Sequence, residues 1–371
     1  MNNKKKILYF VSEDWYFVSH RIELAKQAKI KGYEVTLISN MDKEKEFIEN
    51  QGIKTFHLPI QRSNKNIIRD IFLLSKIYKI IKEENPDILH NVSLKPILYG
   101  TFCARILGIN KIINTFAGLG ILVKYKNDFF KIKFINFFLR LLIKCNPVKI
   151  IVQNKSDKNF FISNNLIHEK NISLILGSGV DMKKFFPSYE TKKDIKIILV
   201  SRMLWSKGIK EFVELAERFK KNRKVFFYLL GKIDSKNPDS VPREYLESLS
   251  LEPNIEWKGH AKNVVKELQA ADIFCYLTSY GEGIPKALIE AAACGLPSVV
   301  SKNSGCLEVI ENDSNGFIVD EKNQDQCYEA LKRLIESKEL RIKFGEFSRN
   351  KVEENLSIEN VNKKTINLYN S

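Results

Sequence analysis

The chain has 371 residues, of which 44% are hydrophobic and 28% are charged. These proportions suit a soluble globular protein and exclude a disordered one, and the length favours two domains of ordinary size. Sixty Lys and Arg residues against 44 Asp and Glu residues give a formal net charge of +16. This excess favours an anionic partner, such as nucleic acid, an acidic membrane surface or a phosphorylated substrate, without choosing among them.

The first residues do not predict export. The basic opening is followed by an apolar run over residues 7–11, which is too short for a signal peptide, and no stretch reaches the length of a clean membrane-spanning helix. The cysteines are Cys103, Cys145, Cys275, Cys294, Cys306 and Cys327. None belongs to a CxxC pair or has a nearby histidine at metal-ligand spacing. We therefore expect reduced thiols, a cytoplasmic protein and no metal site.

Short β-branched runs alternate with helical patterns, which predicts a parallel α/β architecture. In the first half, we expect strands over residues 6–12, 34–39, 54–59, 87–92, 111–116, 149–154 and 172–176. The segment SEDWYFVSHR is expected to be a loop after the first strand. A helix is expected to begin near Ser19 and to stop at Gly32 in a left-handed cap.

A break rich in turn formers and charge occupies residues 177–194, and the pattern then restarts. In the second half, we expect strands over residues 195–201, 225–231, 255–259, 273–278, 298–301 and 316–319. The sequence therefore predicts one domain over 1–178 and a second over 179–354. A C-terminal helix over 355–371 completes the chain, with packing against the first domain as one option.

The segment YGEGIPKALIEAAACGLP, residues 280–297, predicts a helix that begins just beyond the carboxyl end of a parallel strand. Pro285 suits a first helical residue, and Gly295 ends the helix. Ligands of open α/β sheets bind at this edge, and the free amides and helix dipole favour an anion there. These amides lie near Gly283, Ile284 and Lys286.

Glu282 and Glu290 stand eight residues apart in this segment. Eight helical residues span ~12 Å, so the pair could hold sugar hydroxyls on either side of a diphosphate. The separation is too large for the paired carboxylates of a glycosidase, which lie roughly 5 to 9.5 Å apart. The alternative is an alanine-rich core helix whose two glutamates meet solvent.

A second cluster follows the first strand of the second half. In LVSRMLWSKGIKEF, Arg202 and Lys207 come directly after that strand. Two cations there can neutralise a diphosphate, Arg by a bidentate fork and Lys as a point charge. A solvated basic loop is the alternative, but two clusters at matching edges of one sheet favour a site.

These segments, RMLWSKGIKEF and TSYGEGIPKALIEAAACGLPSVVS, resemble the family 4 retaining glycosyltransferases, and the linker GVDMKKFFP matches as well. The resemblance implies the α/β GT-B fold, in which two Rossmann-like domains with parallel sheets face a central cleft. The N-terminal domain would meet the acceptor and the C-terminal domain the nucleotide sugar. The implied reaction transfers a sugar from a nucleoside diphosphate with retention at the anomeric carbon, without a metal or another cofactor.

Carried over by position, the resemblance assigns roles to single residues. Arg202 and Lys207 would hold the diphosphate and stabilise the charge that develops on it. Glu282, the third catalytic residue, would bind hydroxyls of the donor sugar, and Glu290 would bind the ribose. The implied donor-binding set is completed by Gly231, Gly283, Ile284, Pro285 and Lys286.

The first half departs from the family pattern. It lacks the double glycine that is common after the first strand. Instead, His20 and Arg21 open the next helix, where they would either meet a phosphate of the donor or acceptor or belong only to a helix cap. The segment NTFAGLG lacks the usual histidine, so contacts to the donor sugar would pass to backbone at Gly118 and Gly120. His90 faces either the cleft or the core.

The form LHNVSLKPILYG…NTFAGLG resembles a branch associated with O-antigen, capsule and lipid-linked glycan assembly. It implies a lipid-linked glycan acceptor and an N-acetylhexosamine, or a deoxy derivative, carried on UDP. One alternative is a GT-B relative with other nucleotide-sugar chemistry, such as an epimerase or phosphorylase. Another is a nucleic-acid-binding protein, but the chain lacks a basic motif interleaved with aromatics, so we expect no nucleic-acid partner.

Residues 129–147, FFKIKFINFFLRLLIKCNP, place one polar stripe on a predicted helix that is otherwise apolar. The stripe consists of Lys133, Asn136, Arg140 and Lys144. This pattern suits a helix lying in an anionic interface, which predicts peripheral association with the inner face of the cell membrane. A connecting helix that buries its phenylalanines in its own domain is the alternative. The sequence leaves the oligomeric state open.

Overall fold

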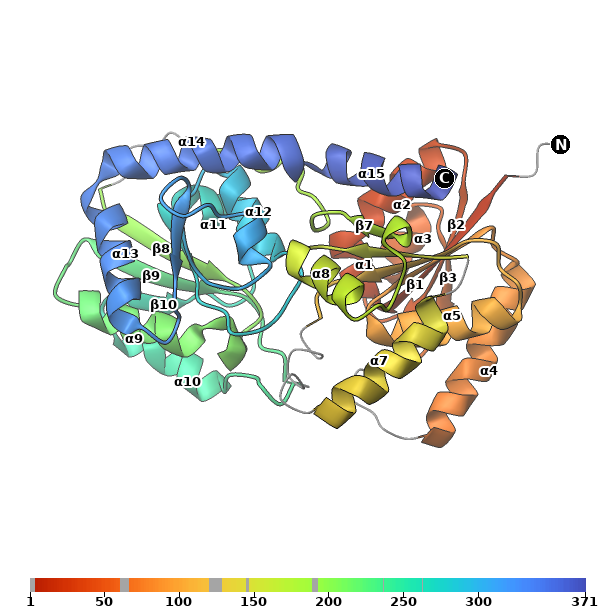
Figure 1. Ribbon diagram of the computed structural model, residues 1–371. Coiled ribbons are helices and arrows are strands. Elements are labelled where there is room, and N and C mark those ends of the chain that lie inside the picture. The colour runs from red at the N-terminus through yellow and green to blue at the C-terminus, as the bar shows by residue number, and fades with distance from the viewer. Residues whose placement is uncertain are drawn as a thin grey trace. The chain divides into compact units, whose positions relative to one another are not determined.

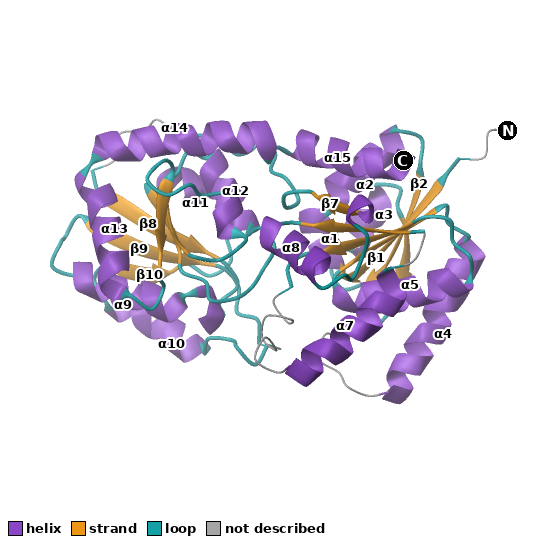
Figure 2. Ribbon diagram, in the orientation of Figure 1, coloured by secondary structure: helices purple, strands orange, loops and turns teal. Residues whose placement is uncertain are grey.

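The computed structural model describes residues 4–60, 67–119, 129–144, 147–188, 193–235, 237–261 and 263–371. The chain forms two compact units. Unit 1 runs to Ser178 and also contains Val361–Ser371, and unit 2 comprises Gly179–Asn360. In each unit, helices cover a parallel sheet (Figure 1, Figure 2).

Unit 1 contains a seven-stranded sheet in the order β3-β2-β1-β4-β5-β6-β7. Its strands are β1 (Lys6–Glu13), β2 (Glu34–Asn40), β3 (Lys54–His57), β4 (Ile88–Val92), β5 (Ile112–Phe116), β6 (Val148–Val152) and β7 (Ile172–Leu174). Its described helices are α1 (Asp14–His20), α2 (Ile22–Ile30), α3 (Lys45–Asn50), α4 (Ile67–Glu84), α5 (Leu94–Ile106), α7 (Phe129–Ile143) and α8 (Lys155–Ser163), with a 3-10 turn at η1 (Glu169–Asn171). The last helix, α15 (Ile358–Asn370), belongs to unit 1 from Val361 onward.

The central strands of unit 1 are buried on both faces, as expected for a parallel sheet with helices on each side. Every residue of β4 and β5 is buried. Alternation along β1 sends Leu8 to a core shared with Ile97 of α5, and Tyr9 to a core on the other face shared with Leu24 of α2. Helices α2 and α5 therefore lie on opposite faces of the sheet.

Unit 2 contains a six-stranded sheet in the order β10-β9-β8-β11-β12-β13. Its strands are β8 (Ile195–Val200), β9 (Val225–Leu230), β10 (Ile255–Trp257), β11 (Ile273–Tyr276), β12 (Ser298–Ser301) and β13 (Gly316–Val319). Its described helices are α9 (Ile209–Phe219), α10 (Arg243–Ser248), α11 (Val264–Ala270), α12 (Lys286–Ala293), α13 (Gln324–Glu336) and α14 (Lys338–Asn355), with 3-10 turns at η2 (Trp205–Lys207), η3 (Leu249–Leu251) and η4 (Cys306–Glu308).

The predicted α/β architecture with two parallel sheets is confirmed, but the predicted loop after β1 is wrong. Asp14–His20 forms α1, Arg21 interrupts the helical path with φ −131°, and α2 follows. Tertiary contacts explain this helix, because Phe17 is fully buried and the Asp14 carboxylate accepts the backbone amide of Asp42 at 2.6 Å. At the other end of α2, Gly32 has the predicted left-handed conformation, with φ 92°.

Each sheet has a switch point, where the chain leaves two neighbouring strands in opposite directions. In unit 1 it lies between β1 and β4, and in unit 2 between β8 and β11. Ligands of open α/β sheets bind beyond the carboxyl ends of such strands. No helix among the described residues is long and apolar enough to cross a membrane.

Candidate functional site

The two clusters predicted from the sequence meet at the switch point of unit 2. Arg202 and Lys207 follow β8, and Glu282 follows β11, which is the direct neighbour of β8 in the sheet. The Lys207 ammonium donates to the Glu282 carboxylate, with 2.8 Å between Nζ and Oε2. The structure therefore joins one residue of each predicted cluster in a single ion pair.

Tyr276, the last residue of β11, completes this arrangement and was missed by the sequence analysis. Its hydroxyl donates to Oε1 of Glu282 at 2.6 Å, so each carboxylate oxygen has its own donor. Burial, reinforced by the Glu282 carboxylate, raises the pKa of Tyr276 well above its usual value, which keeps the phenol protonated as a donor. Only 5% of Lys207 is exposed, and Nζ lies 4.9 Å from the Tyr280 ring centroid. Lys207 and Glu282 are thus held in fixed positions.

The backbone around this pair allows two loops to approach closely. Gly208 has φ 81°, and a Cβ atom there would collide with the carbonyl oxygen of Leu277. The Thr278 hydroxyl donates to the Ser206 carbonyl oxygen at 3.0 Å. The loop after β8 is therefore fastened directly to the loop after β11.

A third loop, after β12, supports the segment that carries Glu282. Asn303 donates its side-chain amide to the carbonyl oxygen of Tyr280 at 2.7 Å, and Ser301 donates its hydroxyl to the carbonyl oxygen of Thr278 at 2.6 Å. Gly305 lies so close to the carbonyl of Gly283 that any side chain would collide with it. These supporting residues were also missed, because their partners lie about twenty positions away in the sequence.

Arg202 is paired with Asp234, which the sequence analysis did not single out. The distance from Nη1 to Oδ2 is 2.6 Å, and the two side chains are 34% and 30% exposed. Exposed ion pairs contribute at most about 1 kcal/mol, so an anionic ligand can compete with Asp234 for this guanidinium. Nearby, Gly231 approaches the carbonyl oxygen of Ser201 too closely for any side chain.

Helix α12 begins at Lys286 with no side-chain capping bond, and Pro285 occupies the N-cap position. Proline has no amide hydrogen and the Ile284 side chain is buried in the core, so Pro285 offers no donor and Ile284 only its backbone. The Glu290 side chain is 15% exposed and lies 3.8 Å from Lys286 Nζ. Burial raises the pKa of Glu290, while Lys286 and Lys184 oppose that shift.

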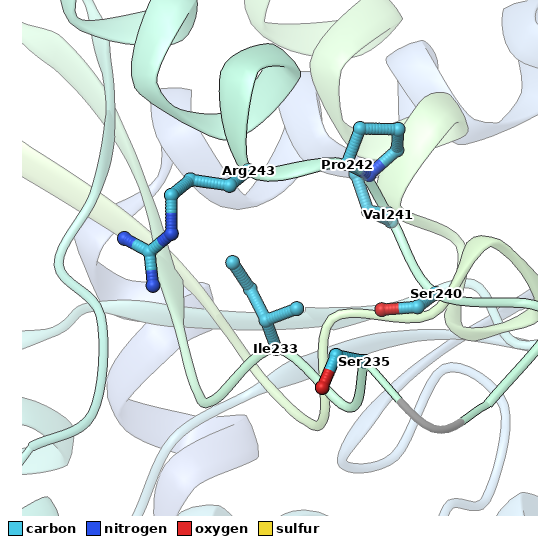
Figure 3. Close-up of a pocket in the computed structure, with 6 residues that line it drawn as sticks. All are labelled: Ile233, Ser235, Ser240, Val241, Pro242 and Arg243. Atoms are coloured by element: carbon cyan, nitrogen blue, oxygen red, sulfur yellow. The ribbon is translucent and has the colours of Figure 1, made fainter.

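A cavity of about 390 Å³ lies beside the segment that follows β9 (Figure 3). It is lined by Ile233, Ser235, Ser240, Val241, Pro242 and Arg243. The hydroxyl oxygen of Ser240 is buried and has no hydrogen-bond partner among the described residues. The volume and the mix of apolar walls with hydroxyls suit a small polar ring system.

In unit 1, the sequence left His90 facing either the cleft or the core, and the structure shows that it belongs to the core, not to a ligand site. His90 is fully buried, with Nδ1 2.7 Å from the Tyr369 hydroxyl and Nε2 2.7 Å from the Thr115 hydroxyl. Burial lowers the pKa of His90 well below its usual value, so the imidazole is neutral. Both ring nitrogens are engaged, and His90 is a residue of the core.

The other predicted residues of unit 1 have different environments. His20 ends α1 and stacks on the Tyr16 ring at 4.1 Å, whereas Arg21 is only 5% exposed. Gly118 has φ 104°, a conformation that favours glycine, and Gly120 lies outside the described residues. No group of three or more His, Cys, Asp and Glu side chains in the described part of the chain could hold a metal ion.

Comparisons with known proteins agree with this geometry. The family model "Glycosyl transferases group 1" matches residues 180–351, and "Glycosyl transferase 4-like" matches residues 6–154. The chain is 30% identical over 341 residues, 87% of each chain, to N,N'-diacetylbacillosaminyl-diphospho-undecaprenol alpha-1,3-N-acetylgalactosaminyltransferase from Campylobacter jejuni. It is 27% identical over 318 residues, 82% of this chain and 80% of the other, to UDP-Gal:alpha-D-GlcNAc-diphosphoundecaprenol alpha-1,3-galactosyltransferase from Escherichia coli. The crystal structure of Anabaena HepE in complex with UDP-glucose has a TM-score of 0.79 at 15% identity, over 98% of this chain and 99% of that one, and shares the fold.

Proposed function

The chain belongs to the family 4 retaining glycosyltransferases of GT-B fold, and we propose that it transfers a sugar from UDP to a lipid-linked glycan in surface polysaccharide biosynthesis. The proposal depends on one observation above all: Lys207 and Glu282 form an ion pair at the switch point of unit 2, and Arg202 belongs to the same loop as Lys207. The proposed donor sugar is an N-acetylhexosamine or a deoxy derivative. The two relatives, whose names specify diphospho-undecaprenol acceptors, support the lipid-linked acceptor.

The two cations of the site have different tasks in this proposal. Arg202 exchanges its partly exposed partner Asp234 for the donor diphosphate, because that pair contributes little stability. Lys207 stays with Glu282 in its buried position and adds a fixed positive charge. Negative charge grows on the departing phosphate in the transition state, and preorganised cations and the amino end of α12 stabilise it.

The carboxylates recognise the sugars on either side of the diphosphate. Glu282 accepts hydrogen bonds from hydroxyls of the donor sugar while Tyr276 and Lys207 hold it in place. Glu290 accepts a hydrogen bond from the ribose in its ionised form. Unit 2 is therefore the donor-binding unit, and Gly231 allows the base or ribose to lie close to the sheet edge.

Unit 1 meets the acceptor at the cytoplasmic face of the membrane in this proposal. In unit 1, α5 contacts both α4 and α7 (Figure 1). Each of the three helices carries large apolar side chains that are exposed. These side chains are Ile71, Phe72, Phe102, Ile106, Phe137, Phe138 and Leu141. Exposed apolar groups of this size mark interaction sites, and a lipid-linked acceptor has to be reached at a membrane.

Helix α7 has features of both alternatives left open by the sequence, a helix packed in the core of its domain and a helix lying in an anionic interface. Leu139 and Ile143 are buried in the core of unit 1, whereas Phe137 is 58% and Leu141 52% exposed. In the predicted polar stripe, Lys133 and Arg140 are exposed. Asn136 and Lys144 donate hydrogen bonds to Asn164 and Asn165. For Phe130 and Phe134 the structure describes the backbone but not the side chain. The outer side of α7 thus has both the apolar groups and the cations that an anionic interface requires.

The activity is tested by incubating the full-length protein with a panel of UDP-sugars and polyprenyl-diphosphate-linked N-acetylhexosamine acceptors. We expect one product with the mass of an added sugar and, by NMR, an anomeric configuration that matches the donor. The Arg202→Ala and Lys207→Ala variants serve as controls that should lose this product. If the UDP-sugars, and GDP-sugars added to the panel, yield only hydrolysis of the sugar nucleotide or no product, the proposed transfer is wrong.

The membrane contact is tested by sedimentation with vesicles of neutral and anionic lipid. Phe137→Gln with Leu141→Gln should weaken binding, while the equally polar change Leu251→Gln, at a residue of unit 2 that is 84% exposed, should not. Arg140→Gln should weaken binding to anionic vesicles only, and Lys210→Gln is its control. A folded parent protein that ignores anionic vesicles at low salt would contradict peripheral docking.

A further inference from the structure

Arg21 is a buried cation with no ion pair among the residues that the structure describes. It lies at the junction of α1 and α2, with α1 between it and the carboxyl end of β1, and is 5% exposed. Its Nε and Nη2 atoms are buried and have no hydrogen-bond partner among the residues that the structure describes. An isolated buried charge is strongly unfavourable, and leaving guanidinium donors unsatisfied adds to that penalty. An anion that is absent from the free protein would remove both penalties.

The polar groups that act electrostatically on this part of the core do not supply that anion. They are Tyr9 of β1, His90 of β4 and Tyr369 of α15, which form one hydrogen-bonded chain. Burial raises the pKa of both tyrosines and lowers the pKa of His90, so all three groups are neutral at pH 7. Arg21 is therefore the charged member of this group.

Two helices on opposite faces of the sheet follow the strands of this switch point, α5 directly after β4 and α2 after β1 and the short helix α1. Helix α2 starts directly after Arg21, and α5 starts directly after Ser93; neither N-cap side chain forms a capping bond in the described structure. Ser93 has φ 77° and ψ 160°, a strained conformation for a residue other than glycine. The first turn of α5 has no acidic residue. The amino ends of both helices favour an anion between β1 and β4.

We propose that the switch point of unit 1 binds a phosphoryl group, with Arg21 as its principal counter-ion and the first amides of α2 and α5 as additional donors. This inference rests on the proposed function, because a glycosyl transfer from a nucleotide to a lipid-linked acceptor brings two diphosphates to the enzyme. Arg202 and Lys207 serve the donor in unit 2, and Arg21 binds a phosphoryl group in unit 1. A guanidinium suits this task, since its fork can bind two phosphate oxygens at once.

The first test compares Arg21→Met with Arg349→Met by thermal unfolding without ligand. Arg349 donates to the carbonyl oxygens of Phe185 and Ala293, so its loss should lower Tm. Arg21→Met removes an unpaired buried charge and retains an unbranched side chain, so it should leave Tm unchanged or raise it. A Tm that falls in Arg349→Met but not in Arg21→Met distinguishes a ligand-binding arginine from a structural one.

The deciding measurement is the rise in Tm that farnesyl diphosphate and UDP each cause. If Arg21→Met abolishes the rise with farnesyl diphosphate and keeps the rise with UDP, the phosphoryl group belongs to the acceptor. The reverse result assigns it to the donor. If both ligands stabilise Arg21→Met as much as the parent, the proposal is overturned.

Arg21→Lys covers the case in which Arg21→Met does not fold. It keeps the positive charge and loses the fork, so the Kd of the relevant diphosphate should rise about tenfold, as expected for one lost charge-assisted hydrogen bond. An unchanged Kd for both diphosphates overturns the proposal. These measurements need no glycosyl transfer, so their failure is distinguishable from failure of the proposed function.

Discussion

Replacement of Glu282 by Gln should destabilise unit 2 far more than its position in a loop suggests. The Lys207 side chain is 6% exposed and the Glu282 side chain 21% exposed, so the change leaves a nearly buried ammonium without its carboxylate. Glutamine can still accept the Tyr276 hydroxyl through Oε1, but its amide group then faces the ammonium, donor against donor. The loss is therefore concentrated on Lys207.

Breaking a buried ion pair from one side costs about 3–5 kcal/mol, and the partial exposure of Glu282 favours the lower end, about 3 kcal/mol. For a unit of this size, that corresponds to a decrease in Tm of about 6–12 °C. Lys207→Met should cost less, about 1–2 kcal/mol, because the more exposed Glu282 carboxylate retains its bond from Tyr276. The double variant should be close to Lys207→Met alone, since neither charge remains.

The assay is a double-mutant cycle by urea unfolding of ligand-free protein, followed by a transfer assay on the same four proteins. We expect a coupling free energy of about 2–3 kcal/mol between Lys207 and Glu282. The double variant should be more stable than Glu282→Gln and about as stable as Lys207→Met. Turnover should be lost in both single variants and in the double variant. Additive effects within about 0.5 kcal/mol would refute the reasoning, because the two side chains would then not form an energetically important pair.

Features encoded by neighbouring residues could be predicted from the sequence. The strands are short β-branched runs, and most strand boundaries agree with the structure within two residues. The left-handed conformations of Gly32 and Gly295 follow from glycine's lack of a Cβ atom, and they end α2 and α12 as predicted. Arg202, Lys207 and Glu282 could be proposed as site residues because each directly follows a predicted strand.

Features that depend on distant partners could not be predicted. His90 is a core residue because Tyr369 and Thr115 occupy its two nitrogens, and Tyr369 lies 279 positions away in the sequence. Asp234 is 32 positions from Arg202, and nothing in its own surroundings indicates an ion pair. The sequence left Arg21 as either a phosphate contact or part of a helix cap. Its burial, with no counter-ion in the described part of the chain, could be seen only in the structure.

The remaining predictions concern the donor. Arg202→Ala should lower kcat at least as much as it raises KM, because the guanidinium acts on charge that develops in the transition state, whereas Asp234→Asn should leave kcat within about twofold. Turnover should persist in EDTA. If EDTA abolishes turnover and added Mn²⁺ or Mg²⁺ restores it, then Arg202 and Lys207 do not replace a metal. Glu290→Gln should weaken UDP binding in calorimetry by ~1.5–3 kcal/mol, the range for a hydrogen bond to a charged group. Burial raises the folded-state pKa of Glu290 above the unfolded value of about 4.3. The protonated carboxyl therefore contributes fully to stability at a pH below the unfolded pKa, and this contribution is lost as the pH rises through the folded-state pKa. Glu290→Gln should therefore raise the Tm of the free protein at neutral pH even as it weakens UDP binding. UDP affinity of the parent should fall as the solution is acidified through the raised pKa, and an equal decrease in the Gln variant would exclude Glu290 as the titrating group.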